Sequence, residues 1–329
     1  MTHESVMEAT KTKLLDIKAV CSPDVPVVYL DYPVYDNIGD LLIHQGGEAF
    51  LRENGYNTLG QFSIHEFARR VDKKQPHLAL KPSIKALDDL VSRHRPTIIM
   101  QGGGNFGDIW PEFQQFREMI VSRYPDSKIV IFPQSIHFHD AAQQKRAASL
   151  FGAHKNLHIF VRDAASLDFV RDECGLPTAL MPDMAHQLWG RLNTGEPGKA
   201  QGVLVQERRD KESRNEGSNE GGFDWDELFS SRDRFMIKAL RKWQIIDNPL
   251  RQVVPNYSLW RPYRDSLVSR ATERFRPYAE IYTDRLHGMI LGALLGKTVR
   301  YTDGNYGKLH RYANLWFQGS DRMHSALGH

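Results

Sequence analysis

The segment 282–296, YTDRLHGMILGALLG, carries the side chains best suited to chemistry. Arg285 supplies a permanent positive charge, and the imidazole of His287 exchanges a proton near neutral pH. Leu286 and Gly288 complete a turn between an expected strand and an apolar helix. Because Gly288 leaves the helix start open, its N–H groups can face an anion. The pattern favours an anion site with a proton donor over a capped helix that carries a surface Arg and His.

A second turn, QGGGNFGDIW (101–110), follows the expected strand 97–100. Consecutive glycines that include Gly103 and Gly104 let the backbone approach a ligand closely. The spacing is neither GxGxxG nor a P-loop, so it does not indicate nucleotide binding. We expect Asn105 to bind substrate beside these glycines.

Four further segments that follow expected strands carry polar residues. In YDNIGD (35–40), Asn37 and Gly39 suit a tight turn and Asp40 suits a helix N-cap, which is also the simpler reading of that segment. Arg162 follows the strand 157–161. Its guanidinium could bind a carboxylate or phosphate of a ligand, or it could form an ion pair with a nearby acidic side chain. The remaining candidates are Gln134 and Ser135, after the strand 128–132, and Lys308, in a glycine-containing turn.

The elements that would position these residues alternate along the chain from about Val25. Short β-branched runs alternate with longer helical patterns, which is typical of a parallel sheet with crossover helices. The expected strands are 25–32, 97–100, 128–132, 157–161, 178–181, 202–207, 279–284 and 298–301. The expected helices are 40–54, 111–124, 224–243, 259–275 and 287–296. In such sheets, ligands bind outside the carboxyl ends of the strands.

The composition of NTGEPGKAQG (193–202) predicts an interdomain linker. We therefore divide the chain into an N-terminal domain, 1–195, and a C-terminal domain, 196–329, whose tail returns to the first. The charged, apolar-poor stretch 208–222 is typical of a surface loop.

Bulk properties exclude several classes of protein. Hydrophobic residues are 41% and charged residues 25% of the 329, as in an ordinary globular protein. The net charge of +3 argues against a dedicated nucleic-acid binder. Two cysteines give neither a disulfide framework nor a metal cluster, and the polar N-terminus is not a signal peptide. We expect a cytoplasmic protein without a metal.

In order and type, these segments resemble the polysaccharide pyruvyltransferase family. The shared features are the N-x-G-D helix start at 37–40, GGGNFGD, Arg162–Asp163, Pro182–Asp183 and the RLHG turn. They span roughly residues 27 to 310. The resemblance implies an α/β, GT-B-like fold, in which two Rossmann-like domains face each other across a cleft.

The resemblance also implies the reaction, the transfer of a pyruvyl group from phosphoenolpyruvate to a sugar as a ketal. It assigns Arg162 and the turn Arg285–Leu286–His287 to the donor, with His287 as general acid and Lys308 as a further cation. Asp40 or Asp108 would accept the hydroxyl proton. No cofactor is expected beyond the donor.

The acceptor would be a glycan of an exopolysaccharide, either free or lipid-linked, with peripheral contact at the inner membrane face. The oligomeric state is left open. The alternative is a GT-B-type glycosyltransferase with a nucleotide-sugar donor, which a nucleoside diphosphate rather than phosphoenolpyruvate would stabilise.

Overall fold

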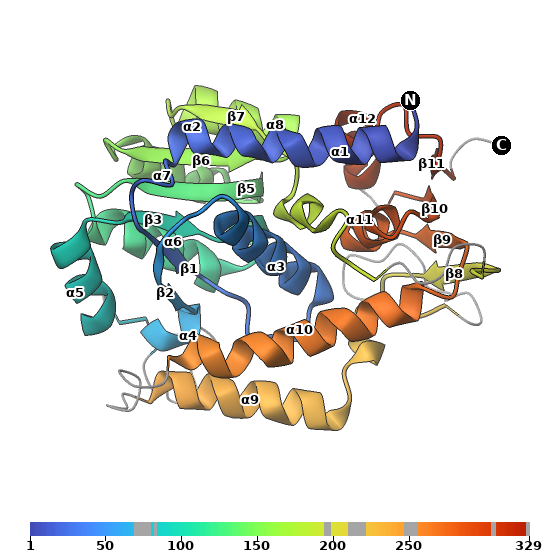
Figure 1. Ribbon diagram of the computed structural model, residues 1–329. Coiled ribbons are helices and arrows are strands. Elements are labelled where there is room, and N and C mark those ends of the chain that lie inside the picture. Colours follow the sequence, from blue (N-terminus) through green and yellow to red (C-terminus); the bar gives the residue numbers. More distant parts are fainter. Residues whose placement is uncertain are drawn as a thin grey trace.

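The computed structural model describes residues 1–68, 80–81, 84–193, 199–209, 222–246, 255–303 and 307–326. Its described strands form two parallel sheets, one from each half of the chain (Figure 1). The predicted α/β class with parallel sheets is therefore confirmed. The cleft of a GT-B fold and the boundary at 195/196 stay predictions.

The first sheet has the strand order β2-β1-β3-β5-β6-β7, with β4 paired to β5. Its central strands are nearly continuous apolar runs, as expected for strands that are buried on both faces. The bounds are β1 Val27–Leu30, β2 Thr58–Phe62, β3 Thr97–Met100, β4 Gly103–Gly107, β5 Ile129–His137, β6 Leu157–Val161 and β7 Thr178–Leu180.

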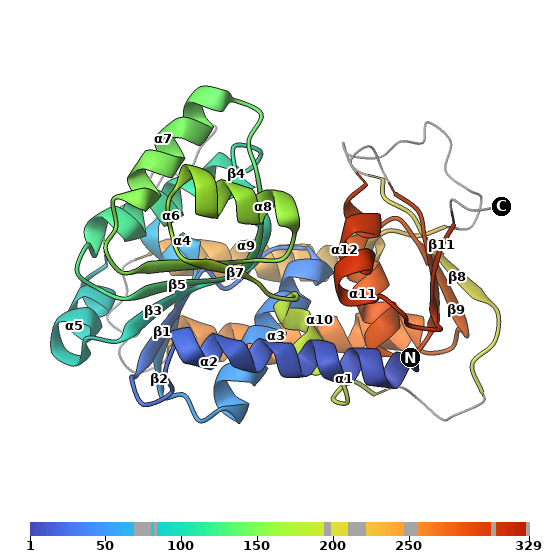
Figure 2. The same cartoon turned by 90° about the horizontal axis from the view of Figure 1, so that it is seen from above.

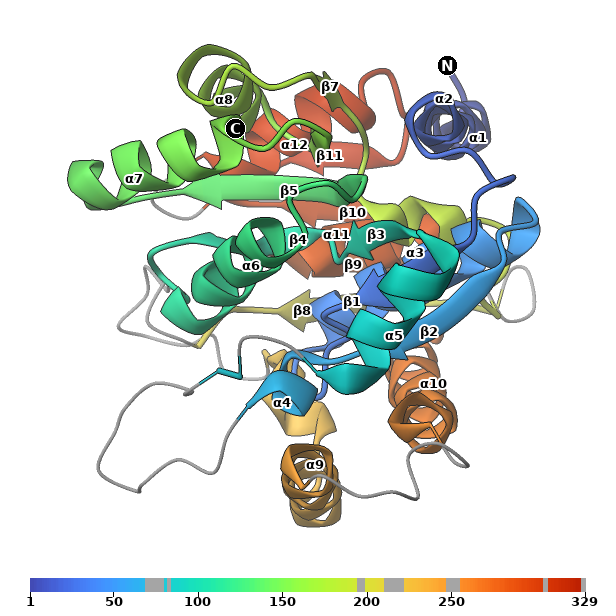
Figure 3. The ribbon, with the colours of Figure 1, turned by 90° about the vertical axis from the view of Figure 1, so that its left-hand side faces the viewer.

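Helices cover both faces of this sheet (Figure 3). One face packs against α5 (Lys85–His94), α6 (Pro111–Arg123) and α7 (Ala141–Gly152). The other packs against α3 (Ile38–Glu53) and the segment that contains α2 (Ile17–Val20). The shorter helices of this half are α4 (Ile64–Phe67), α8 (Ala164–Asp168), the π-helix Phe169–Glu173 and the 3-10 helices Leu14–Asp16 and Met184–Leu188.

The second sheet has the order β11-β10-β9-β8. Its strands are β8 Val203–Gln206, β9 Glu280–Thr283, β10 Thr298–Tyr301 and β11 Met323–Ser325. Helices α11 (Leu286–Leu294) and α12 (Lys308–Trp316) lie on the side that faces the first half (Figure 2). The start of α11 therefore points towards the carboxyl ends of the first sheet.

Three long helices join the two halves (Figure 1). In α1 (His3–Lys13), the His3 Nε2 atom lies 2.8 Å from the carbonyl oxygen of Ala293 in α11. Helix α9 (Ser231–Ile245) packs on α4, and α10 (Asn256–Phe275) packs on α3 and β2, although both follow β8 in the chain. These contacts hold the two sheets in one arrangement.

Several local predictions were wrong. The expected helix 224–243 is divided into a 3-10 helix, Trp225–Leu228, and the helix α9. The division occurs because each of these two helices begins with a capping box of its own. The glycine-rich turn contains the strand β4, and Lys308 begins α12 instead of lying in a turn. Residues 194–198 of the expected linker and 210–221 of the expected loop lie outside the described part.

Candidate functional site

A buried carboxylate, Asp183, forms the centre of the site at the carboxyl ends of the first sheet. Arg162 directly follows β6, is 1% exposed and forms an ion pair with Asp183 through Nη1. The Arg162 Nε–H donates to the Ser135 hydroxyl at 2.9 Å. The predicted residues Arg162 and Ser135 therefore lie together, and Asp183 fixes the orientation of the guanidinium.

His287, from the second half, reaches the same carboxylate. Its Nε2 atom lies 3.4 Å from Asp183 Oδ2, and its side chain is 15% exposed. Burial by itself would raise the pKa of Asp183, but the hydrogen bond to His287 and the charge of Arg162 hold that pKa below its usual value. Asp183 is thus an anion between two basic groups, one from each half of the chain.

The start of α3 packs against the imidazole. A Cβ atom at Gly39 would overlap the His287 ring, with the ring Cγ only 2.8 Å away, so glycine provides the room for the histidine. Asn37 caps α3, since its side-chain oxygen accepts the Gly39 N–H at 3.0 Å. The predicted cap, Asp40, lies instead in the first turn, where its Oδ2 accepts from Asn37 Nδ2 at 2.7 Å.

Asp40 is the carboxylate best placed to exchange a proton. Burial raises its pKa, and the charge of His287 only partly offsets that effect. A Cβ atom at Gly103 would lie 3.5 Å from Asp40 Oδ1, which places this carboxylate against the glycine-rich segment. A carboxyl group with a raised pKa is suited to general base catalysis near neutral pH.

The glycine-rich segment brings two cations close together. A Cβ atom at Gly104 would lie 2.9 Å from Arg162 Nη2 and 3.6 Å from Lys308 Nζ. Gly104 is exposed, and Lys308 is the exposed first residue of α12. The backbone at Gly104 therefore leaves space next to both positive groups, which is the environment of an anion site.

Helix α12 is bonded to the same strand ends. The Asp183 N–H donates to the Tyr312 hydroxyl at 3.0 Å, and His186 Nε2 lies 3.0 Å from that hydroxyl. The Trp316 Nε1–H donates to the Arg162 carbonyl at 3.0 Å. These bonds fix Lys308 relative to Arg162, although the two residues are 146 positions apart in sequence.

The other residues of the RLHG turn have different surroundings. Arg285 forms an ion pair with Asp224, and the contacts between described residues do not bring it to Arg162. Leu286 is 8% exposed and belongs to the hydrophobic core of the second half. A Cβ atom at Gly288 would overlap the Gln206 side chain, so this glycine permits close packing of α11 on the second sheet.

The remaining predicted residues form hydrogen bonds to other parts of the protein. The Asp108 carboxylate accepts the N–H groups of His139 and Asp140 at 2.7 and 2.8 Å, which makes it a loop cap. Gln134 is fully buried, and its amide donates to the Gln101 carbonyl at 2.8 Å. Asn105 accepts two bonds from a buried arginine. Of the two candidate bases, Asp40 is therefore the better placed.

Asp183 contacts both Arg162 and His287, but it is not among the candidate site residues predicted from the sequence. The sequence shows it only as part of the shared Pro182–Asp183 pair. The signal was nonetheless present, because Asp183 follows the strand 178–180 at the same sheet edge as Arg162. Polar residues after parallel strands lie where ligands collect, which is the signal that indicates this residue.

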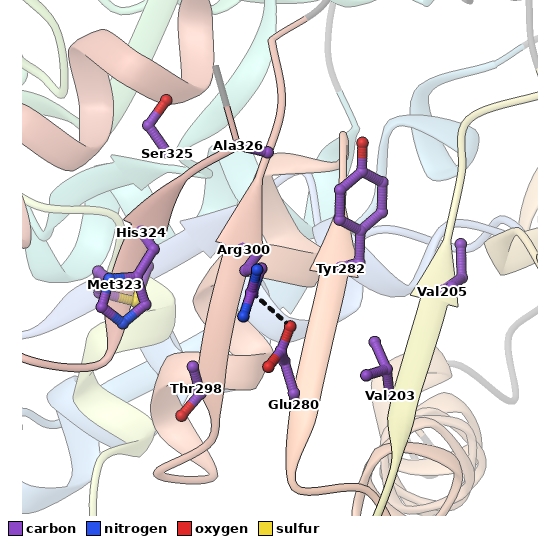
Figure 4. Close-up of a pocket in the computed structure, with 10 residues that line it drawn as sticks. All are labelled: Val203, Val205, Glu280, Tyr282, Thr298, Arg300, Met323, His324, Ser325 and Ala326. Atoms are coloured by element: carbon purple, nitrogen blue, oxygen red, sulfur yellow. Dashed lines mark ion pairs between the residues drawn. The ribbon is translucent and has the colours of Figure 1, made fainter. Parts of the chain in front are cut away.

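The structure also contains a hollow away from this site. It has a volume of about 810 Å³ and lies on the outer face of the second sheet (Figure 4). Its floor includes the Glu280–Arg300 ion pair, with 2.6 Å between Oε1 and Nε. None of the residues that line it belongs to the cluster around Asp183.

Two further features are absent from the described residues, a metal-binding cluster and a membrane-spanning helix. No group of three or more His, Cys, Asp or Glu side chains in this part of the chain could hold a metal ion. Nor does any helix in the described ranges combine the length and apolar character needed to cross a membrane.

Comparisons with known proteins are consistent with the geometry. The family model described as polysaccharide pyruvyl transferase matches residues 37–303. The chain is 35% identical to the Bacillus subtilis (strain 168) protein named "Putative pyruvyl transferase EpsO", over 97% of this chain and 94% of that protein. It is 25% identical to "Pyruvyl transferase 1" of Schizosaccharomyces pombe, over 89% of this chain and 70% of that protein.

A solved structure shows the same fold. It is that of an uncharacterized protein from Klebsiella pneumoniae, with a TM-score of 0.57 and 18% identity. The alignment covers 97% of this chain and 98% of that one. At this identity the likeness concerns the fold alone.

Proposed function

Because the chain belongs to the polysaccharide pyruvyl transferase family and is a transferase, we propose that it moves a pyruvyl group from phosphoenolpyruvate to a sugar as a ketal. The observation that carries this proposal is the buried Asp183 carboxylate, which holds Arg162 and His287 from the two halves of the chain side by side. The glycosyltransferase alternative is not favoured by the family match.

The charge of the site suits such a donor. Phosphoenolpyruvate carries about three negative charges at neutral pH, from one carboxylate and one phosphate. Arg162, Lys308 and a protonated His287 carry positive charge in the site, and Asp183 and the proposed base Asp40 carry negative charge. The two cations nearest Gly104 are Arg162 and Lys308, and the bonds of Arg162 to Asp183 and Ser135 orient its guanidinium before the donor binds.

The proposed chemistry needs one proton donor and one proton acceptor. Protonated His287 gives its proton to the methylene carbon, which becomes a methyl group, and positive charge develops on the adjacent carbon. One sugar hydroxyl attacks that carbon and loses its proton to Asp40. Phosphate then leaves, and a second hydroxyl attacks to close the ketal. The departed phosphate, still in the site, takes up the proton of this second hydroxyl. Asp40 then loses one proton to solvent and His287 regains one, which restores both groups for the next turnover.

The position of His287 is compatible with this role. Its 3.4 Å separation from Asp183 is longer than a usual charged hydrogen bond of about 2.8 Å. The ring can therefore exchange this contact for one to a bound donor, as catalytic hydrogen bonds that are loose without ligand often do. Asp183 stabilises the protonated ring, which the proton donor requires.

We also propose how the two halves of the chain and the acceptor are arranged. The two sheets would act as the halves of a GT-B-like enzyme, with the acceptor between them. The acceptor would be an exopolysaccharide unit, free or lipid-linked, which a cytoplasmic enzyme would reach by peripheral contact with the membrane. No cofactor or metal is included in this scheme.

The direct test is turnover with defined substrates. The purified protein is incubated with phosphoenolpyruvate and a panel of glycans, and both phosphate release and glycan-bound pyruvate are measured. We expect both products in equal amounts with at least one acceptor, and loss of both in His287→Ala. Phosphate release that is insensitive to this substitution, or turnover only with a nucleotide sugar, would overturn the proposal.

A further inference from the structure

A buried arginine lies beneath the glycine-rich segment. Arg117, on α6, is 0% exposed. Its Nη1–H donates to the Asn105 carbonyl at 3.0 Å, and its Nη2–H donates to the Asn105 side-chain oxygen. The guanidinium carbon lies 5.2 Å from the centre of the Phe106 ring. Two nitrogens of one planar group thus bind both the backbone and the side chain of Asn105, which fixes its conformation.

The charge partner of Arg117 adopts an unusual backbone conformation. Asp31 directly follows β1 and is 3% exposed. Its φ of 70° is a value that residues other than glycine rarely adopt. Its Oδ2 atom is 4.0 Å from Arg117 Nη2. Within the described ranges, Asp31 Oδ1 and Arg117 Nε have no hydrogen-bond partner. The pair is therefore buried, strained and incompletely bonded.

A pair that served only stability would be built differently. Well-packed apolar side chains commonly replace a buried ion pair without loss of stability. Backbone strain and unsatisfied buried polar groups persist mainly where function maintains them. Asn105 is the residue after Gly104, whose open side faces Arg162 and Lys308. The arginine thus acts on the wall of the anion site.

We propose that Arg117 is a positioning residue that holds Asn105 so that Gly104 stays open towards Arg162 and Lys308, and thereby sets the affinity for the phosphorylated donor. Asp31 is the buried acidic partner of Arg117, with 4.0 Å between Oδ2 and Nη2. Because the ligand is the donor of the reaction proposed above, this inference rests on that function.

The test is a double-mutant cycle in the full-length protein. Arg117→Lys keeps the charge and removes the two-pronged contact, and Asn105→Ala removes the acceptor side chain at a half-buried position. Each variant is expected to raise the KM for phosphoenolpyruvate about tenfold with kcat changed less than threefold. The double variant should be little worse than Arg117→Lys alone, because the side-chain bond that Asn105→Ala removes is already lost in Arg117→Lys. Arg146→Lys is the control, since Arg146 lies on α7 and is exposed, and its Nη2 is 3.2 Å from Oε1 of Glu118, a neighbour of Arg117 on α6.

The readouts separate positioning from folding and from the proposed function. A fall in kcat with unchanged KM, or additive effects in the double variant, would show a purely structural pair. Hydrogen exchange of the amides in 103–107 should be faster in Arg117→Lys than in the wild type, and unchanged exchange would refute the inference without any substrate. If the wild type does not turn over phosphoenolpyruvate, the proposed function fails, while the exchange result still decides the positioning role.

Discussion

Replacing Gly39 with alanine should separate the position of His287 from the stability of the protein. The new Cβ atom would lie 2.8 Å from the ring Cγ, whereas ordinary contacts begin near 3.4 Å, and it would overlap the ring edge more severely. The imidazole must therefore move by roughly 1 Å, and a displacement of this size costs on the order of 100-fold in rate. Alanine is a better helix former than glycine by up to about 1 kcal/mol, which opposes any loss of stability.

The same helix offers a matched control. A Cβ atom at Gly47 would overlap the Tyr29 hydroxyl, with the ring Cζ atom 3.1 Å away, in the core beneath the sheet. Gly47→Ala should therefore lower the midpoint of thermal unfolding but retain kcat within about threefold for the folded protein. Gly39→Ala should instead lose kcat and keep its unfolding midpoint close to that of the wild type.

Both variants are compared by phosphate release from phosphoenolpyruvate and by thermal unfolding. The reasoning would be refuted if Gly39→Ala kept more than half of the wild-type kcat. It would also be refuted if Gly47→Ala lost as much activity as Gly39→Ala at equal folded fraction, because the effect would then come from disturbing α3 and not from His287.

Three further predictions concern charge. Asp183→Asn removes the counter-ion of Arg162 and His287 and should destabilise the fold by about 3 kcal/mol at pH 7. The pKa of Asp183 is lowered in the folded state, so this difference in stability should shrink as the pH falls below about 4, which urea titrations at several pH values would show. Asp31→Asn keeps a residue that tolerates positive φ, and burial raises the pKa of Asp31 to about 7. The stability of the wild type relative to the variant should therefore fall as the pH rises from about 4 through 7, by at most about 4 kcal/mol. Denaturation that is equally pH-dependent in both proteins would contradict this. Lys308→Met should raise the KM for phosphoenolpyruvate about tenfold or more with little change in unfolding temperature, and an unchanged KM would remove Lys308 from the site.

The sequence predicted the parts of the site that depend on local patterns. Arg162 directly follows β6 of the first sheet, and His287 lies in the first turn of α11, just after β9 of the second sheet. The carboxyl ends of parallel strands are where ligands bind. The α11 start was found from the contrast between TDRLHG and the apolar run after it. These signals are short-range, so one sequence is sufficient to recognise them.

The parts that were missed depend on long-range packing. Arg285 forms an ion pair with Asp224, which lies 61 positions away in the sequence, and no local pattern predicts that pairing. The need for glycine at position 39 arises only because His287 arrives from the other half of the chain. Asn37 and Asp40 are both good capping residues, so their sequence could not decide which one caps α3.

The measurement that tests the central claim most directly is a crystal structure of the protein with phosphoenolpyruvate. We predict that the donor lies beside Gly104, with its phosphate or carboxylate within hydrogen-bonding distance of Arg162 and Lys308 and its methylene carbon facing His287. A donor bound elsewhere, with the Arg162–Asp183–His287 cluster untouched, would contradict the account.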